Sequence, residues 1–316
     1  MLTRFRIAAL AAAASLGAAA LSVPASAHTP PATVLTPYGR VPRSDVVQVD
    51  NHQALQVVNG QVEKVDLRSH AVVARLGAAA SGPASADPFR HAASLRAQAG
   101  ITQSGTPQAG AAPSASASAT DLGGNCPADW GPTNIQSFKT TWTVPPKPSD
   151  STSTTTFFIW NGLAGGALQP VLQWGNGTAA YQIANWYYVG GKYAHGTYLS
   201  VSPGTSLTGR IDFVSQSNGT YTYKESFAGY PSADVTVNRT SAADGVIECF
   251  EPYTDGDATK NPDAPDVAMK NISLTGRPGH TAPPTIAWTG NSSAASTKVV
   301  DSSSSNGEVD LYFNGV

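Results

Sequence analysis

Two glutamates three residues apart, Glu248 and Glu251 in GVIECFE, are the first candidates for acid–base chemistry in this chain. The run is rich in β-branched and aromatic residues and predicts a strand. Residues three apart in a strand lie about 10 Å apart along it and point to opposite faces. A retaining glycosidase needs its two carboxyls about 5 Å apart on the same side of the sugar. The two glutamates are therefore not a glycosidase pair, and each has to be considered with other partners.

The alternation of the strand gives the two glutamates different surroundings. Glu248 shares its face with Val246 and Phe250, whereas Glu251 shares the other face with Cys249. A carboxyl between apolar neighbours has a raised pKa and can exchange a proton in mild acid, as a general base and acid must. We therefore take Glu248 as the candidate base. The alternative is a glutamate that faces a groove and only forms a hydrogen bond.

Other catalytic chemistries have no support in the sequence. His195 and His280 are far apart and lack the spacing of metal ligands, and the loop TDGDATKNPDAPD lacks the spacing of a calcium loop. There is no G-x-S-x-G elbow, and the GNG at 175–177 precedes a strand rather than a helix. We expect no metal and no cofactor.

Composition and the chain's first residues favour a secreted protein. Residues 1–27 have a basic start, an apolar stretch and an A-x-A site, which is typical of a signal peptide. No later segment is apolar for long enough to span a membrane. The net charge of -2, with only 13% charged residues, predicts neither nucleic-acid nor membrane partners. In an oxidising compartment the two cysteines, Cys126 and Cys249, predict one disulfide. We expect a monomer.

The chain divides into four segments by composition. After the signal peptide, residues 28–78 are valine-rich and predict a small propeptide-like segment with a hairpin at Asn59-Gly60; a docking appendage is the alternative. Residues 79–123 are rich in Ala, Ser, Gly and Pro and predict a linker. Residues 124–316 contain one short strand pattern after another, with a turn every 8 to 12 residues, and predict an antiparallel β-sandwich.

Several motifs of this last region resemble those of the glutamic peptidases, the eqolisin family (peptidase family G1). FIWNG, VLQWG, ANWYYVGG, VSPGTSLTG and DGVIECFE occur in the family's order and approximate spacing over about residues 134–275. The resemblance implies a concanavalin A-like (jelly-roll) β-sandwich, a propeptide and activity in acid. It also implies a catalytic dyad at Gln173, in VLQWG, and Glu248, in GVIE. An uncharged amide such as that of Gln173 can donate to a developing oxyanion without changing charge with pH.

The resemblance further implies a polypeptide substrate held by a groove. Its substrate-binding positions fall on four residues: Trp160, Trp174, Asn185 and Trp186. The chain departs from the family at Ala164, where an acidic residue is usual, and at Asn185, where the family's W-Y-E-W-Y has a glutamate. A second hypothesis stays open: a carbohydrate-binding or carbohydrate-active sandwich without peptidase activity. Its groove would be lined by Trp160, Trp174, Trp186, Tyr187 and Tyr188, and its ligand would be a polysaccharide. The two hypotheses differ in whether Gln173 and Glu248 face one another.

Overall fold

The computed structural model describes residues 32–80, 126–129, 134–164, 167–254, 256–288 and 297–314. In these ranges the chain forms strands and short 3₁₀ helices, and no α-helix. The 3₁₀ helices are η1 (Arg43–Asp45), η3 (Pro231–Ala233) and η4 (Ala258–Lys260). No helix in this part of the chain is long and apolar enough to cross a membrane. The expected signal peptide and nearly all of the expected linker lie outside the described residues.

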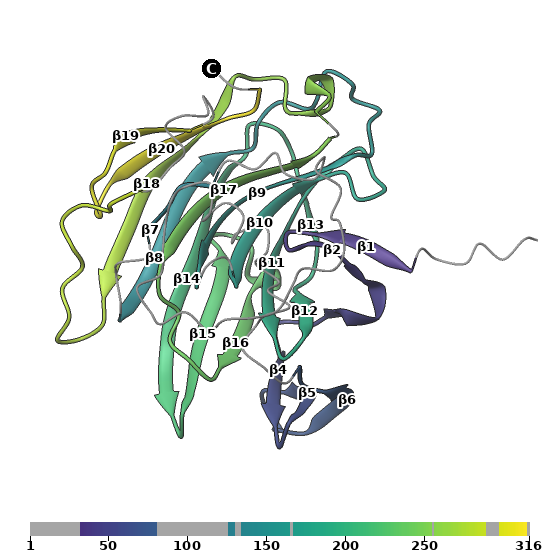
Figure 1. Cartoon of the computed structure of the whole chain (residues 1–316), viewed down its shortest axis with the longest axis vertical. Coiled ribbons are helices and arrows are strands. Elements are labelled where there is room, and N and C mark those ends of the chain that lie inside the picture. The colour runs from purple at the N-terminus through teal and green to yellow at the C-terminus, as the bar shows by residue number, and fades with distance from the viewer. Residues whose placement is uncertain are drawn as a thin grey trace, which may run out of the picture. The chain divides into compact units, whose positions relative to one another are not determined.

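The larger of the two main sheets has eight strands (Figure 1). Its order is β3 (Val46–Gln48), β12 (Lys192–His195), β11 (Tyr181–Val189), β10 (Leu168–Trp174), β9 (Thr156–Leu163), β17 (Val246–Tyr253) and β7 (Ala128–Asp129), with β13 (Leu199–Val201) paired to β11. Neighbouring strands in this order are antiparallel, except that β3 adds to β12 in parallel.

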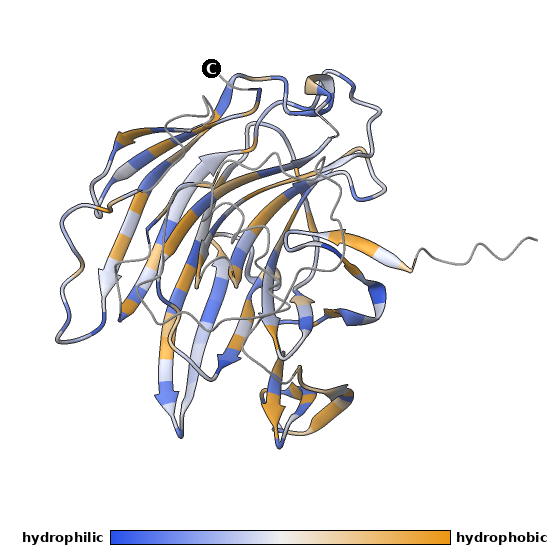
Figure 2. Ribbon diagram, viewed as in Figure 1, coloured by the Kyte–Doolittle hydropathy of each residue, from blue (hydrophilic) through white to orange (hydrophobic). Residues whose placement is uncertain are grey.

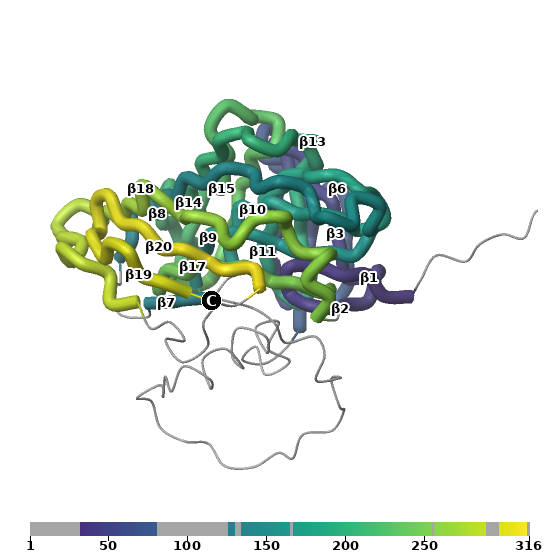
Figure 3. Tube along the Cα trace, turned by 90° about the horizontal axis from the view of Figure 1, so that it is seen from above, coloured from purple at the N-terminus to yellow at the C-terminus, as the bar shows by residue number. Residues whose placement is uncertain are grey.

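The second main sheet has seven strands and is antiparallel throughout. Its order is β16 (Val235–Arg239), β15 (Thr220–Phe227), β14 (Ser206–Ser217), β8 (Ile135–Thr143), β18 (Asp266–Gly276), β20 (Gly307–Tyr312) and β19 (Thr297–Asp301). Along β14 apolar and polar residues alternate, as they do in a strand with one buried face (Figure 2). The two sheets form the layers of a β-sandwich (Figure 3), which confirms the predicted fold class.

The eight-stranded sheet is buried on both faces. Side chains of its inner face pack with the seven-stranded sheet in the main core: Phe157, Ile159, Leu172, Ile183 and Phe250 against Phe138, Trp142, Leu207 and Ile211. Side chains of its outer face form a separate cluster: Phe158, Trp160, Val171, Ala184, Trp186, Ile247 and Cys249. Because side chains alternate along a strand, neighbouring residues of β9, β10, β11 and β17 belong to different faces.

The N-terminal segment forms two small sheets, one with two strands and one with three. They are β1 (Thr33–Thr36) with β2 (Gly39–Pro42), and β4 (Gln53–Val58), β5 (Gln61–Asp66) and β6 (Val72–Ala78). Asn59 and Gly60 join β4 to β5 with φ of 49° and 73°. Two positive φ values are what a type I′ hairpin requires, so the predicted hairpin is confirmed.

Part of this segment belongs to the main core. Val49, Leu55 and Val62 are fully buried in the cluster that lies between the two main sheets. The Leu55 N–H also donates to the Tyr187 hydroxyl on β11, at 3.0 Å. Val49, Leu55 and Val62 are therefore structural in this fold, and the propeptide role of residues 28–78 stays a prediction.

Candidate active site

Gln173 and Glu251 lie in one row across the outer face of the eight-stranded sheet. In the strand register Gln173 of β10 is opposite Phe158 of β9, and Phe158 is opposite Glu251 of β17. Residues two apart in a strand point to the same face. Gln173 therefore shares the face of Val171, and Glu251 shares the face of Cys249; Val171 and Cys249 both belong to the outer cluster. Two strand spacings put their backbones about 10 Å apart. Phe158 lies between them in the register, and its fully buried side chain belongs to the same outer cluster.

Glu248 lies on the opposite face. It is fully buried, it is in register with Asn161 of β9, and its Oε1 accepts a hydrogen bond from the Thr140 hydroxyl of the seven-stranded sheet. Burial raises its pKa well above the ordinary glutamate value, and the Thr140 hydrogen bond lowers it. The structure does not bring Gln173 and Glu248 together, so the expected pairing is wrong, and the peptidase hypothesis fails in the form that required these two residues to face one another. The apolar neighbours of Glu248 belong to the core between the sheets, not to a groove.

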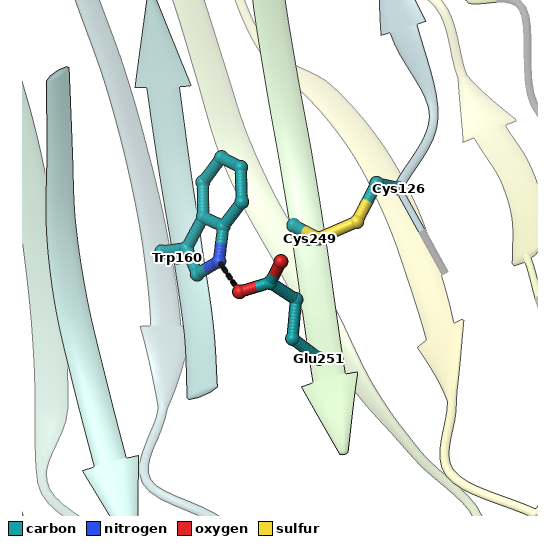
Figure 4. The surroundings of a disulfide bond; sticks show 4 residues. All are labelled: Cys126, Trp160, Cys249 and Glu251. Atoms are coloured by element: carbon teal, nitrogen blue, oxygen red, sulfur yellow. Dashed lines mark hydrogen bonds between the residues drawn. A yellow bond between two sulfur atoms is a disulfide. The ribbon is translucent and has the colours of Figure 1, made fainter. Parts of the chain in front are cut away.

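Glu251 is held by Trp160 (Figure 4). The Trp160 Nε1–H donates to Glu251 Oε2 at 3.0 Å, from the neighbouring strand. Glu251 is only 2% exposed. This burial raises its pKa to about 8, and the Trp160 hydrogen bond lowers it. A carboxyl in these surroundings can hold a proton well above the usual pH range of glutamate.

The W-x-G pattern has a physical reason at this site. A Cβ on Gly162 would lie 2.9 Å from the Trp160 ring and 2.8 Å from the Leu168 carbonyl oxygen. Only a glycine leaves room for the indole to lie along the outer face. The glycine therefore permits the ring position from which Trp160 reaches Glu251.

Gln173 is oriented by a second glutamine on the next strand. Its Nε2 donates to Gln182 Oε1 at 3.4 Å, and the two residues are opposite one another in the β10–β11 register. The amide has two N–H donors, so one remains for another acceptor. Gln173 is 2% exposed, and its Oε1 has no hydrogen-bond partner within the described ranges.

The four expected substrate-binding residues divide between the two faces. Trp160 and Trp186 lie on the outer face. Trp174 belongs to the main core, where it stacks on Phe157 at a centroid distance of 6.4 Å. Asn185 is fully buried on the inner face, and its Nδ2 donates to the Ala233 carbonyl oxygen at 2.7 Å. Trp174 and Asn185 therefore cannot line a groove on the face that carries Gln173.

Gln182 and Glu251 are the two site residues that the sequence-based assignment missed. Strand alternation placed Glu251 on the face opposite Glu248, and it left open which face carries Gln173. Gln182 lies three residues before Asn185 in the same aromatic strand. The comparison with the family's W-Y-E-W-Y placed Asn185 at the glutamate position, so Gln182 was not considered. The polar residue beside Gln173 is a glutamine, whereas Asn185 points to the other side of the sheet.

The predicted disulfide is confirmed. Cys126 and Cys249 are bonded, and they are 123 residues apart in sequence. Cys249 lies two residues before Glu251 on the same face, so the bond ties the chain that precedes β7 to the strand that carries Glu251 (Figure 4). A crosslink that closes so long a loop restricts the unfolded chain strongly.

Aromatic side chains fill the outer face beside this row. The Trp186 ring contacts His195 at a centroid distance of 4.8 Å, and His195 contacts Tyr198 at 4.7 Å. Burial lowers the pKa of His195, and its hydrogen bond with the Gly196 carbonyl oxygen raises it. No group of three or more metal-binding side chains occurs among the described residues. The polar groups of this face therefore include the His195 imidazole as well as the Glu251 carboxyl, the Gln173 and Gln182 amides and the Trp160 indole N–H.

No family model and no curated protein matches the chain by sequence. Among solved structures, scytalido-glutamic peptidase with a peptide-based transition-state analogue aligns with a TM-score of 0.37 and 14% identity, over 60% of this chain and 97% of that one. SCP-B, a member of the eqolisin family in complex with the tripeptide Ala-Ile-His, aligns with a TM-score of 0.36 and 12% identity over the same shares. An alginate lyase from Klebsiella pneumoniae aligns with a TM-score of 0.21 and 11% identity, over 37% of this chain and 50% of that one.

Proposed function

We propose that this protein is a secreted, acid-acting endopeptidase of the glutamic peptidase type, with Gln173 and Glu251 as its dyad. The observation that supports this most directly is the row Gln173–Phe158–Glu251 on one face of the sheet. A hydrogen bond with Gln182 orients Gln173, and a hydrogen bond from Trp160 orients Glu251. Glu248 is not part of the dyad, because the seven-stranded sheet closes over it.

Glu251 supplies the base and acid of the reaction. Its ionised carboxylate takes a proton from a water molecule, and the water oxygen forms a bond to the carbonyl carbon of the peptide. The proton on Glu251 then passes to the amide nitrogen as the carbon–nitrogen bond breaks. The products are a carboxylic acid and an amine, and the carboxylate is restored. Neither a covalent intermediate nor a redox step is needed.

Gln173 stabilises the negative charge that develops on the carbonyl oxygen. One N–H of its amide donates to Gln182, which fixes the plane of the amide, and the other is free to donate to the oxyanion. An amide carries out this role equally at pH 3 and pH 7. Trp160 keeps the Glu251 carboxyl in position through its indole N–H.

Carbohydrate binding is the second candidate function. Of the five aromatic residues expected to line its groove, Trp174 and Tyr187 belong to the main core. Trp160, Trp186 and Tyr188 remain in or against the outer cluster. A sugar site on this face would therefore have to use these three, beside the same carboxyl and amide.

Cleavage of denatured protein and of a fluorogenic peptide mixture between pH 2 and 7 tests the proposal. The full-length protein is compared with Glu251→Gln and with Glu308→Gln, a matched change on β20 of the other sheet. We expect acid-dependent cleavage that Glu251→Gln removes and Glu308→Gln keeps. Absence of cleavage together with retention on a polysaccharide column would overturn the peptidase proposal in favour of carbohydrate binding.

A further inference from the structure

Residues of the segment 33–48 (the cover) pack against part of the outer face that carries the proposed dyad. Leu35, Tyr38 and Val46 all pack into or against the outer cluster. Tyr38 lies between β1 and β2 and is only 7% exposed. The low exposure of Gln173 and Glu251 is therefore measured with this segment in place.

Tyr38 sits in a pocket made by residues beyond the linker. Its ring meets Trp186 edge-on at a centroid distance of 6.3 Å and Tyr193 at 5.3 Å. Its hydroxyl donates to the Ala167 carbonyl oxygen at 3.4 Å. The pocket thus offers aromatic surfaces to a ring and a backbone acceptor to its para hydroxyl, which are the contacts that recognise a tyrosine side chain.

The turn that carries Tyr38 reaches across the sheet above the dyad. Tyr38 contacts Trp186 on β11, while the next residue, Gly39, lies beside the Tyr253 hydroxyl on β17, about 4.0 Å from the position of a Cβ. In the sheet order β10 and β9 lie between those two strands, and they carry Gln173 and Trp160. Burial raises the pKa of the Tyr38 hydroxyl well above its ordinary value; charges on Glu225 and Glu251 raise it further, and Arg239 lowers it.

Tyr38 lies in a closed turn, and the segment is anchored to the eight-stranded sheet at its far end. The Tyr38 N–H donates to the Thr36 hydroxyl at 3.1 Å, within a closed turn rather than an extended strand. The segment is fixed at its far end by an ion pair between Asp45 and Lys192 of β12, 2.7 Å apart, and by the parallel pairing of β3 with β12.

We propose that the Tyr38 pocket is a subsite for an aromatic side chain of the substrate, and that residues 33–48 occupy it as an internal competitor. This inference rests on peptide hydrolysis at Gln173 and Glu251. It assigns the substrate class as polypeptides with a tyrosine or phenylalanine near the bond that is cut. Val49, Leu55 and Val62 do not take part, because they belong to the main core.

Tyr38→Ala in the full-length protein tests the cover, with Tyr312→Ala on β20 as the matched control. We expect the initial rate of cleavage of a fluorogenic peptide to rise at least about tenfold in Tyr38→Ala, a shift of about 1.4 kcal/mol in the covered-to-open equilibrium. We expect no change in Tyr312→Ala. The synthetic peptide 33–48 should inhibit the Tyr38→Ala protein, and the same peptide with alanine in place of Tyr38 should inhibit at least about tenfold less.

Fluorescence anisotropy of labelled peptides separates this inference from the proposed function. If the Tyr38→Ala protein binds a tyrosine-containing peptide more tightly than its alanine analogue but cleaves neither, the subsite stands and the peptidase proposal fails. If it cleaves both peptides equally, at the wild-type rate, the peptidase stands and the subsite is refuted. Should Tyr38→Ala not fold, Asp45→Asn takes its place, because it removes the ion pair that anchors the cover. An unchanged rate in a folded Asp45→Asn protein, with no inhibition by peptide 33–48, would refute the cover.

Discussion

Glu248 and Glu251 belong to the same strand, and the two faces of that strand give them different chemistry. On the inner face Glu248 meets Thr140 of the opposing sheet and lies beside Asn161. On the outer face Glu251 meets the Trp160 indole and shares a row with Gln173. Burial raises the pKa of both carboxyls. What separates them is what they face: the seven-stranded sheet for Glu248 and the side chains of the outer cluster for Glu251.

The inner face carries a polar layer inside an apolar core. Asn161 donates to the Gly209 carbonyl oxygen on β14 and Asn185 to the Glu225 carbonyl oxygen on β15, so each amide joins the two sheets. Glu225 is fully buried on the seven-stranded sheet, and burial raises its pKa as well, while Arg239 lowers it. Buried polar groups that bridge two layers favour one alignment of those layers over others. The inner glutamates are therefore structural, and a raised pKa alone does not mark a catalytic residue.

Replacement of the two glutamates separately should give the largest contrast between the faces. Glu251→Gln removes the group that activates water, so we expect cleavage to fall about 100-fold or more. Glu248→Gln keeps the shape of an inner-face residue that has no path to substrate, so we expect cleavage within about threefold of wild type. Steady-state rates on one fluorogenic peptide measure both, with circular dichroism to verify the fold. Loss of cleavage in folded Glu248→Gln, with activity retained in Glu251→Gln, would reverse the assignment.

Gln173→Ala should give the next largest effect. Removal of one oxyanion donor costs roughly 3 to 4 kcal/mol of transition-state stabilisation, or about 100- to 1000-fold in kcat. The substrate contacts of the outer face remain, so KM should change little. Asn185→Ala is the inner-face comparison, and it should lower the unfolding temperature rather than kcat of the folded protein. A fall in kcat for Asn185→Ala as deep as that for Gln173→Ala would show that the site extends through the sheet.

The inner glutamates should make stability depend on pH in one direction. Their folded-state pKa values lie above the unfolded value of about 4.3, so the stability that they contribute is complete below that pH. This stability is lost as the pH rises through the pKa values of the folded state. Each unit by which the folded pKa exceeds the unfolded pKa corresponds to about 1.4 kcal/mol of stability. We expect the free energy of unfolding to fall from mild acid to neutral pH, as measured by urea denaturation.

Glu248→Gln should reduce this loss, because an amide has no charge to bury. Glu308→Gln serves as the control, since Glu308 pairs with Lys270 and is partly exposed. A Glu248→Gln protein with the same pH dependence as wild type would show that Glu248 does not contribute to it.

Sequence patterns predicted the sandwich, the Asn59-Gly60 hairpin and the Cys126–Cys249 disulfide, because each depends on local chemistry or on the number of cysteines. Alternation also predicted correctly that Glu248 and Glu251 point to opposite faces. It could not tell which face lies against the second sheet, because β9, β10 and β17 are buried on both sides and apolar residues occur on each. That choice depends on pairing between strands far apart in sequence, which also determines that Gln182 rather than Asn185 lies beside Gln173.

Gln182 gives the smallest and most specific of the expected effects, because it acts on the reaction through Gln173. Gln182→Leu removes the acceptor that fixes the amide plane, so the N–H of Gln173 points at the oxyanion for a smaller fraction of the time. We expect kcat to fall about tenfold with KM unchanged, the size of one neutral hydrogen bond. Gln182→Glu keeps an acceptor in either protonation state, because a protonated carboxyl retains its carbonyl oxygen, so it should recover the kcat that Gln182→Leu loses. A purely structural role for Gln182 would instead lower the stability of Gln182→Leu and leave kcat of the folded protein unchanged.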